Sequence, residues 1–346
     1  MFTDMPETAL RTFRSAVLDP SDFDEFWAST LSTARSAAVS RPPSFTPFPT
    51  PLTSVTITDV AFAGFGGDEV RGWLVVPAGA DAAADPAAGA DAAANAAAGD
   101  ARPALPAVIE YLGYGGGRGN PLAHLLYASA GFVHFVMDSR GQGSGRGQGA
   151  GATADPHGSG PAFSGVMTRG ITDRDTYYYR RLFTDAVLAV DVVAALPFVD
   201  SSRVGVVGGS QGGALALAVA GLRNDLAAVV AFVPFLSDIL RATTITNENP
   251  YAEIAHYLAT QRDQVDVVAS TLAYFDGVNF ARRATAPVWY SAALMDPVCP
   301  PSTVFASYNE YAGPKQLTVW PYNGHEGGAM EDRAAALRVF AETLGG

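Results

Sequence analysis

The chain has 346 residues, of which 48% are hydrophobic and 16% are charged, and its formal net charge is −12. This amount of apolar side chain supplies a large buried core and excludes an intrinsically disordered protein. The acidic balance argues against a nucleic-acid partner and against an anionic membrane, because most of the surface would repel either one.

A single cysteine, Cys299, excludes an internal disulfide framework and fits a reducing compartment. Residues 1–16 mix acidic and basic side chains without an apolar run, which predicts that they are not a secretory signal. No stretch approaches the ~18 consecutive apolar residues of a membrane span. We therefore expect a soluble, cytoplasmic protein.

The first predicted helix covers residues 21–39. Ser21 and Asp24 have the spacing of a capping box, and apolar residues follow at helical intervals. The proline-rich passage 42–51 comes next and is expected to cross the surface.

Residues 55–62 and 70–76 predict two strands of a hairpin that turns at Gly66-Gly67. Residues 78–102 are almost entirely Ala, Gly and Asp, a composition that cannot contribute to a packed core. We interpret this stretch as a solvated loop insertion between two strands.

Further along the chain, apolar strand-like runs alternate with helical patterns. The runs are 107–112, 132–137, 204–207, 227–233, 288–293 and 317–320, and the clearest helices are 176–195, 211–222, 303–311 and 330–344. This alternation indicates a mostly parallel sheet of about eight strands with helices on both faces. Residues 236–286 are expected to form a helical insertion over its carboxyl edge. We expect one α/β domain over 1–346, with 1–50 as an N-terminal helix and extended arm.

The strongest functional motif is Gly208-Gly209-Ser210-Gln211-Gly212-Gly213, which follows a short apolar strand and opens a helix of small residues. This is the strand–turn–helix setting of the G-x-S-x-G motif of α/β-hydrolases. The glycines permit a tight, strained turn that exposes the hydroxyl of Ser210. The backbone N–H of Gln211 then lies at a helix N-terminus, where it can stabilise an oxyanion.

A serine nucleophile needs a base, and His325 follows the last predicted strand, as the Ser, Asp, His order of this fold requires. His134 lies in mid-strand, which favours a structural role, and the other three histidines do not suit that order. Asp296 emerges at the carboxyl end of the preceding strand, where it could orient the imidazole. Asp276, in a turn-like setting, and Glu310, on a predicted solvated helix face, are the weaker candidates for the acid.

The run from Glu110 to Gly117 ends a strand in glycines, where a backbone N–H can approach a substrate oxygen. Arg140, after the next strand, is interpreted as a structural clamp for loop carbonyls or carboxylates. Motifs for nucleotide binding and the H-E-x-x-H zinc motif are absent from the sequence, so we expect neither a cofactor nor a metal. Cys299 is interpreted as a buried, inert thiol.

Together these residues resemble the acetyl xylan esterase and cephalosporin C deacetylase family, carbohydrate esterase family 7. The resemblance covers nearly the whole chain. The motifs that carry it are Asp22–Trp27, Gly113–Arg118, Asp138–Gly143, Met167–Gly170 with Thr176–Arg181, Gly208–Gly213, Pro250–Glu253, Tyr274–Phe280, Met295–Thr303 and His325-Glu326.

The resemblance implies that Ser210, Asp296 and His325 are the catalytic triad and that the amides of Tyr114 and Gln211 bind the oxyanion. It also implies a homohexamer acting on small acetylated sugars and cephalosporin C. The long 78–102 segment, and Gly115 where the family often has asparagine, depart from the pattern.

The sequence thus predicts a serine esterase that removes short acyl groups, chiefly acetyl, through an acyl-enzyme. An exopeptidase or acylaminoacyl hydrolase of the same fold is the enzymatic alternative, because the same serine turn occurs there. An inactive binding protein is the non-enzymatic alternative, and the intact serine, aspartate and histidine argue against it.

Overall fold

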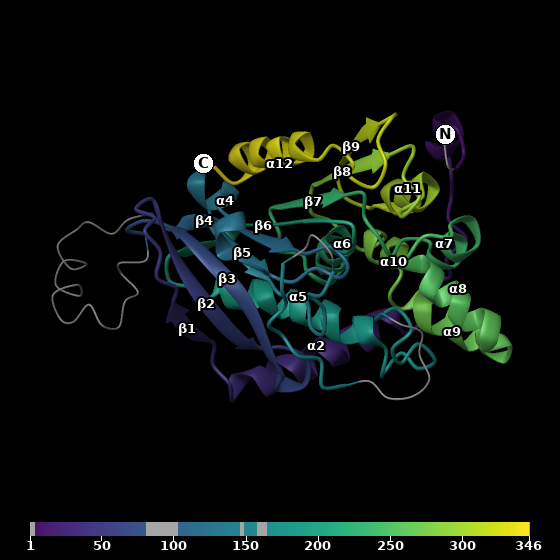
Figure 1. The fold of residues 1–346 in the computed structure, drawn as a ribbon, viewed down its shortest axis with the longest axis horizontal. Coiled ribbons are helices and arrows are strands. Elements are labelled where there is room, and N and C mark those ends of the chain that lie inside the picture. The colour runs from purple at the N-terminus through teal and green to yellow at the C-terminus, as the bar shows by residue number, and fades with distance from the viewer. Residues whose placement is uncertain (1–3, 81–102, 146–148, 158–164, 346) are drawn as a thin grey trace.

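The computed structural model describes residues 4–80, 103–145, 149–157 and 165–345 (Figure 1). Its strands are β1 Ser44–Pro47, β2 Val55–Ala63, β3 Glu69–Pro77, β4 Leu105–Tyr111, β5 Val133–Met137, β6 Val199–Gly209, β7 Ala228–Phe232, β8 Val288–Ala293 and β9 Lys315–Trp320. Its α-helices are α1 Glu7–Leu10, α2 Phe23–Val39, α4 Leu126–Ser129, α5 Tyr178–Ala194, α6 Gln211–Leu222, α7 Ile239–Ile245, α8 Tyr251–Thr260, α9 Val265–Ala273, α10 Gly277–Ala281, α11 Pro301–Glu310 and α12 Met330–Thr343.

Within the described residues, nine strands form one sheet in the order β1-β2-β3-β5-β4-β6-β7-β8-β9. The pairs from β1 through β3 to β5 are antiparallel, and the pairs from β5 through β4 to β9 are parallel. The sheet has one strand more than the expected eight. The additional strand is β1, which forms inside the proline-rich passage and pairs with β2 from Ser44 opposite Ala61 to Pro47 opposite Thr58.

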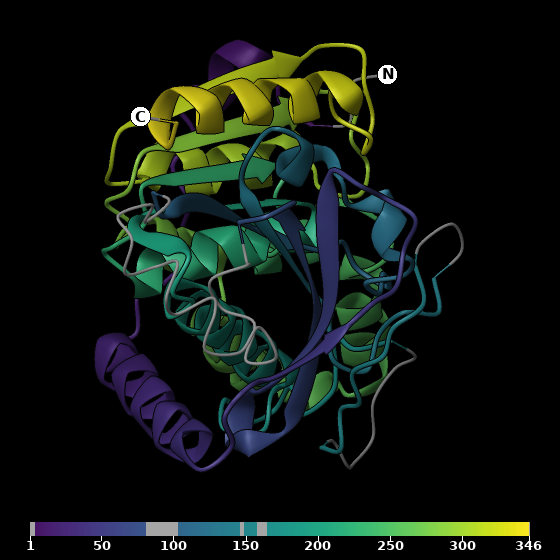
Figure 2. The same cartoon turned by 90° about the vertical axis from the view of Figure 1, so that its left-hand side faces the viewer.

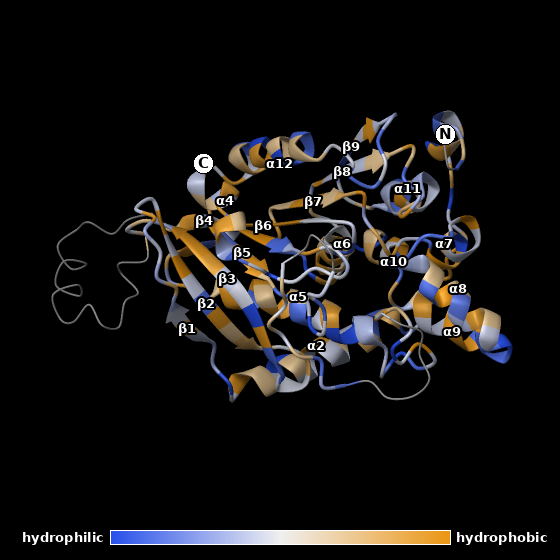
Figure 3. Ribbon diagram, in the orientation of Figure 1, coloured by the Kyte–Doolittle hydropathy of each residue, from blue (hydrophilic) through white to orange (hydrophobic). Residues whose placement is uncertain are grey.

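Helices cover both faces of this sheet (Figures 1 and 2). On one face α5 and α6 pack on β4, β6 and β7, with α2 outside α5 and α10 against α6. On the other face α12 packs on β7, and α4 packs on β3 and β5. All five residues of β5 are buried, and Figure 3 shows the hydrophobic colouring concentrated on the strands. Strands buried on both faces read as continuous apolar runs, and this confirms the predicted α/β fold.

The predicted hairpin is confirmed: β2 and β3 pair from Val55 opposite Pro77 to Ala63 opposite Glu69. The first predicted helix is also confirmed as α2, but the expected capping box is wrong. The N-cap residue is Asp22, and its side chain makes no capping hydrogen bond. Instead its carboxylate accepts hydrogen bonds from Arg174 and from the hydroxyl of Tyr274. These long-range partners replace the local contact because a charge-assisted pair is the stronger bond.

Of the low-complexity segment 78–102, residues 81–102 lie outside the described part of the chain. The segment 236–286 forms α7 to α10, and α8 lies beside the loop that follows β4, where Glu253 contacts Tyr114. No helix in the described ranges is both long enough and apolar enough to cross a membrane.

Candidate active site

A sharp turn between β6 and α6 carries Ser210. Its backbone has φ 55° and ψ −119°, a conformation that is rare for a residue with a side chain. A Cβ atom at Gly208 would lie 2.2 Å from the carbonyl carbon of Gly212, and one at Gly212 would lie 2.1 Å from the carbonyl oxygen of Tyr111. Glycine is therefore required at both positions. The turn is held by hydrogen bonds from Ser210 N–H to the Phe232 carbonyl and from Phe235 N–H to the Ser210 carbonyl.

Three of the predicted site residues form a continuous chain of hydrogen bonds. His325 Nε2 lies 2.9 Å from Ser210 Oγ, and His325 Nδ1 lies 2.9 Å from Asp296 Oδ2. Asp296 is fully buried, whereas 30% of the His325 side chain is exposed. The structure therefore brings together Ser210, His325 and Asp296 from the ends of three different strands, in the order that proton transfer through an imidazole needs.

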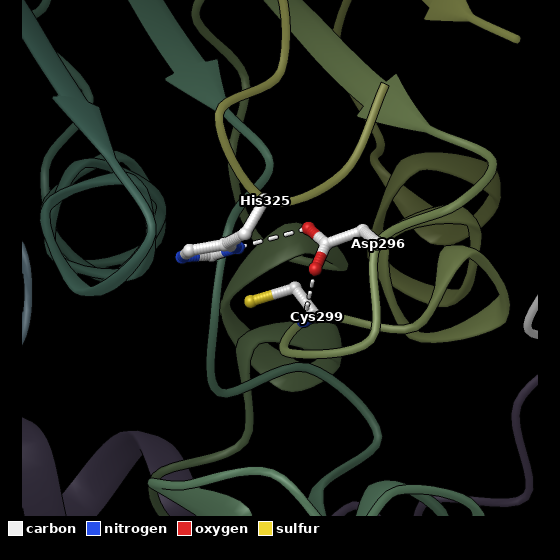
Figure 4. Close-up of side chains that lie close together, drawn as sticks. All are labelled: Asp296, Cys299 and His325. Atoms are coloured by element: carbon white, nitrogen blue, oxygen red, sulfur yellow. Dashed lines mark hydrogen bonds and ion pairs between the residues drawn. The ribbon is translucent and has the colours of Figure 1, made fainter. Parts of the chain in front are cut away.

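The carboxylate of Asp296 is fixed at both oxygens (Figure 4). Oδ2 faces His325, and Oδ1 accepts hydrogen bonds from the amides of Val298 at 2.8 Å and Cys299 at 2.9 Å. A carboxylate held in this way orients the imidazole and favours protonation of the nitrogen remote from Ser210 when the site is at rest.

The two competing acids lie elsewhere. Asp276 caps α10 and accepts hydrogen bonds from the amides of Asp238, Ile239 and Val278. Glu310 belongs to α11 and forms ion pairs with two arginines. Their environments give each a structural role.

Cys299 is buried as expected, and burial raises the pKa of its thiol well above the ordinary value. Its position in the site was not predicted: the thiol points toward the His325 ring (Figure 4). Within the described ranges, Asp296, Cys299 and His325 are the group of side chains that could hold a metal ion, since their ligand atoms lie within 4.8 Å of one another. A metal there would compete with the hydrogen bonds that join His325 to its neighbours.

Gln142, a residue that the sequence analysis did not select, joins the loop of Tyr114 to the first residue of α6, Gln211. Gln142 Oε1 accepts a hydrogen bond of 2.6 Å from the Gly115 amide, and Gln142 Nε2 donates one of 2.9 Å to Gln211 Oε1. The side chain of Gln211 is fully buried, and it also accepts a hydrogen bond from Tyr179. Gln142 belongs to the family motif Asp138–Gly143, and that membership was the only sequence feature that could have marked it as a site residue.

Tyr114 is held through its side chain. Its hydroxyl donates to Glu253 Oε1 at 2.7 Å and accepts from the Val166 amide at 2.8 Å. Glu253 Oε2 accepts from the Met167 amide at 3.1 Å. Burial raises the pKa of the Glu253 carboxyl above its ordinary value. The sequence did not predict that α8 contributes this contact.

Aromatic rings lie close to the serine on the side of α8. The ring centroids of Phe235 and Tyr114 are 6.4 Å apart, and those of Phe235 and Tyr251 are 4.3 Å apart. Phe235 and Tyr251 are both fully buried. The Phe235 amide donates to the Ser210 carbonyl, so the backbone of Phe235 lies directly beside the turn.

Arg140 has the contacts of the predicted structural clamp. Its buried guanidinium donates two hydrogen bonds to Asp185, at 2.6 and 2.9 Å, and further bonds reach Asp68 and Asp155. Its bonds therefore join α5 to the segments of Asp68 and Asp155, and none of the contacts found for it in the described residues is with the triad.

Comparison with known proteins identifies relatives along the whole chain. The family model described as acetyl xylan esterase (AXE1) matches residues 1–342. The solved acetyl xylan esterase from Paenibacillus sp. R4 is 34% identical, with a TM-score of 0.85 over 98% of this chain and 100% of that chain. Acetyl xylan esterase 1 from Thermoanaerobacterium sp. JW/SL YS485 is 32% identical, with a TM-score of 0.81 over 96% of this chain and 98% of that chain.

Among curated proteins, acetyl esterase Axe7A from Xylanibacter ruminicola is 34% identical over 208 residues. The match covers 59% of this chain and 45% of that protein, so this chain spans less than half of the curated relative. The family model, by contrast, matches nearly every residue and agrees with the fold of both solved esterases. The chain therefore belongs to the acetyl xylan esterase family and is a carboxylic ester hydrolase.

Proposed function

We propose that the protein removes acetyl groups from small acetylated sugars by a serine mechanism with an acyl-enzyme intermediate. The observation that carries the proposal is the unbroken chain from Ser210 Oγ through the His325 ring to the buried Asp296 carboxylate, with 2.9 Å at each step. A serine hydroxyl becomes an effective nucleophile only beside such an oriented base.

In the first half of the reaction, His325 Nε2 takes the proton of Ser210 as Oγ attacks the ester carbonyl carbon. The tetrahedral intermediate collapses when the bond to the sugar oxygen breaks, and His325 gives its proton to that oxygen. Water then attacks the acetyl-serine with His325 again as base, which releases acetate and restores the serine. Asp296 stays ionised and stabilises the imidazolium in both halves.

The negative oxygen of each tetrahedral intermediate is assigned to the amides of Gln211 and Tyr114. The Gln211 amide belongs to the first turn of α6, where backbone N–H groups lack partners within the helix and the dipole favours negative charge. The bridge through Gln142 supports this assignment, because it ties the loop of Tyr114 to the turn of Ser210. Rigidly placed donors of this kind supply a large share of the rate of acyl transfer.

The substrate class rests on the family and on the names of the relatives. Both solved relatives are acetyl xylan esterases and the curated relative is an acetyl esterase. We extend this to acetylated xylo-oligosaccharides and, from the family resemblance, to cephalosporin C. The same resemblance supports a homohexamer, and the single cysteine supports a reducing, cytoplasmic compartment.

The test is Ser210→Ala assayed on acetylated xylose, cephalosporin C, aryl acetate and a peptide amide. The change removes only a hydroxyl from the turn, so we expect the unfolding temperature to be kept. Ester turnover should fall by a factor on the order of 10⁴ to 10⁶, as for other triad serines. Turnover near that of the wild type would overturn the mechanism, and peptide cleavage exceeding ester cleavage would favour the peptidase alternative.

A further inference from the structure

A carboxylate at the end of β4 lies where two cavities meet. The first, of about 190 Å³, is lined by Ser210 and His325, and the second, of about 350 Å³, runs along the glycine-rich loop 113–119. Both cavities are also lined by Glu110, Gly209 and Arg333. The larger volume falls within the range of ~300–1,000 Å³ that is usual for small-molecule sites.

Glu110 lies beside two histidines that the proposed mechanism does not use. Its Oε2 lies 3.1 Å from His134 Nε2 and 3.5 Å from His124 Nδ1. The other nitrogen of each ring lies at a backbone carbonyl, with His124 Nε2 3.1 Å from Arg118 O and His134 Nδ1 2.9 Å from His124 O. Each imidazole therefore donates to Glu110 when it is protonated at both nitrogens. Burial alone would raise the pKa of Glu110, but the two imidazoles hold it well below its ordinary value. The Glu110 side chain is 12% exposed, so part of its carboxylate remains accessible from the two cavities that it lines.

Arg333 faces the other oxygen of Glu110 from the first turn of α12. The distance from its guanidinium to Glu110 Oε1 is 3.7 Å, which is longer than a hydrogen bond. The Arg333 side chain is 45% exposed. Both groups also line the two cavities, so each can offer hydrogen bonds to a molecule bound there, Glu110 as an acceptor and Arg333 as a donor.

We infer that Glu110 and Arg333 form the subsite that binds the hydroxyl groups of the alcohol part of the ester, beside the Ser210–His325 pair. The inference deepens the proposed function and rests on it for the position of the reacting ester. A polyhydroxylated ring donates to the carboxylate and accepts from the guanidinium at once. An apolar alcohol would strip water from both charges without replacing its hydrogen bonds, which is unfavourable.

The lining of the first cavity is rich in hydrogen-bond acceptors. Glu326 and Asp332 line it together with Glu110, and Arg333 adds a donor. The lining thus suits an alcohol that offers several hydroxyl groups.

The position also suits the order of events. His325 must deliver its proton to the leaving oxygen, so the alcohol has to lie on the side of the serine that His325 occupies. The first cavity lies on that side.

The experiment compares kcat/KM on a monoacetylated methyl xyloside and on 4-nitrophenyl acetate for the wild type, Glu110→Gln and Arg333→Gln. The control is Arg338→Gln, an exposed arginine farther along the same helix. We expect the ratio of sugar ester to aryl ester to fall roughly tenfold or more in Glu110→Gln and in Arg333→Gln, because each loses a charged hydrogen bond. The ratio should stay at the wild-type value in Arg338→Gln.

A second measurement separates the subsite from the reaction. Free methyl xyloside is tested as an inhibitor of 4-nitrophenyl acetate hydrolysis, and its inhibition constant should rise in Glu110→Gln and Arg333→Gln but not in Arg338→Gln. Equal losses on both esters, or an unchanged inhibition constant, would overturn the subsite. Inhibition by xyloside in a wild type that does not cleave the sugar ester would overturn the proposed substrate and leave the subsite standing. Arg333 is half exposed, so its variant keeps the test valid if Glu110→Gln fails to fold.

Discussion

At the scale of single residues, the choice between Asp296 and Asp276 depends on what each carboxylate contacts. Asp296 divides its oxygens between His325 and two loop amides, whereas the hydrogen bonds described for Asp276 come from amides at the starts of α7 and α10. Both are buried, so burial does not distinguish them. Their partners do, because only a contact with the base can affect proton transfer.

We predict that Asp296→Asn lowers kcat by a factor on the order of 10² to 10⁴, because the amide stabilises the wrong tautomer of His325 and cannot balance an imidazolium. Steady-state kinetics on an aryl acetate would measure the loss. The matched control is Asp276→Asn, which should keep kcat and lower the unfolding temperature instead. Burial raises the pKa of Asp276 to about 7, so at neutral pH the exchange removes only part of a charge. A larger kinetic loss in Asp276→Asn would move the acid to that residue.

The histidine-bound carboxylate of Glu110 predicts a pH dependence of stability. Its pKa is depressed in the folded protein, so the folded state binds fewer protons than the unfolded state once the pH falls below the ordinary value near 4.5. The stability that Glu110 contributes is then present at neutral pH and lost in acid. The difference in unfolding free energy between the wild type and Glu110→Gln should therefore shrink from pH 7 to pH 3. Denaturant titrations at several pH values would measure it, and a constant difference would contradict the depressed pKa.

The sequence alone was sufficient to select Ser210, His325 and Asp296, because a glycine-rich turn and the ends of strands can be recognised from local sequence patterns. It was insufficient for Glu110, His124 and His134. Their contacts join β4, β5 and a loop between them, and no spacing in the sequence encodes which side chains meet across a sheet. His134 was correctly placed in a strand, yet its partner follows only from the parallel register of β4 and β5.

At the scale of elements, the parallel strands and the long helices were predictable and two strand features were not. All four residues of β1 are exposed, and three of them are a proline or lie next to one, so neither periodicity nor composition indicates a strand. β6 begins at Val199, five residues before its predicted start. Its first part contains Asp200, which accepts hydrogen bonds from Ser202, a pattern that is typical of a turn.

The contact between α8 and the loop after β4 predicts coupling between two distant residues. Tyr114→Phe removes the hydroxyl that Glu253 accepts, and Glu253→Gln weakens the same contact from the other side. Each change should lower kcat by about tenfold with a smaller effect on KM, because a misplaced Tyr114 amide stabilises the oxyanion less well. The double variant should lose little more than either single variant, since both break one interaction.

A double-mutant cycle on one aryl acetate would measure this coupling. Losses that simply multiply in the double variant would show that Glu253 does not act through Tyr114. Losses in KM alone would point to a role in substrate affinity and remove Glu253 from the positioning of the oxyanion donor.

At the scale of the whole molecule, the candidate site is a meeting point of elements that lie far apart in the chain. The sheet supplies the strand ends that carry Ser210 and Asp296, and α12 supplies Arg333 on one side. The segment 236–286 supplies Tyr251 and Glu253 on the other side. The cavity beside Ser210 is lined by charged side chains, whereas Phe235 and Tyr251 are fully buried. With the alcohol in the inferred subsite, we expect the acyl group on the side of these rings.

We therefore predict a strong preference for acetyl over longer acyl chains. Phe235 and Tyr251 are fully buried and their rings are 4.3 Å apart, so extra methylene groups would meet close-packed side chains that cannot move aside without cost. For acetyl, butyryl and octanoyl esters of one leaving group, kcat/KM should fall in that order. The corresponding loss of transition-state stabilisation should exceed the ~1–3 kcal/mol per methylene of ordinary hydrophobic pockets. Phe235→Leu should raise the ratio of butyryl to acetyl turnover. Because both rates are measured on the same preparation, this ratio does not depend on the fraction of the variant that is folded. Octanoyl turnover equal to acetyl turnover in the wild type would place the acyl chain in open space, away from these rings.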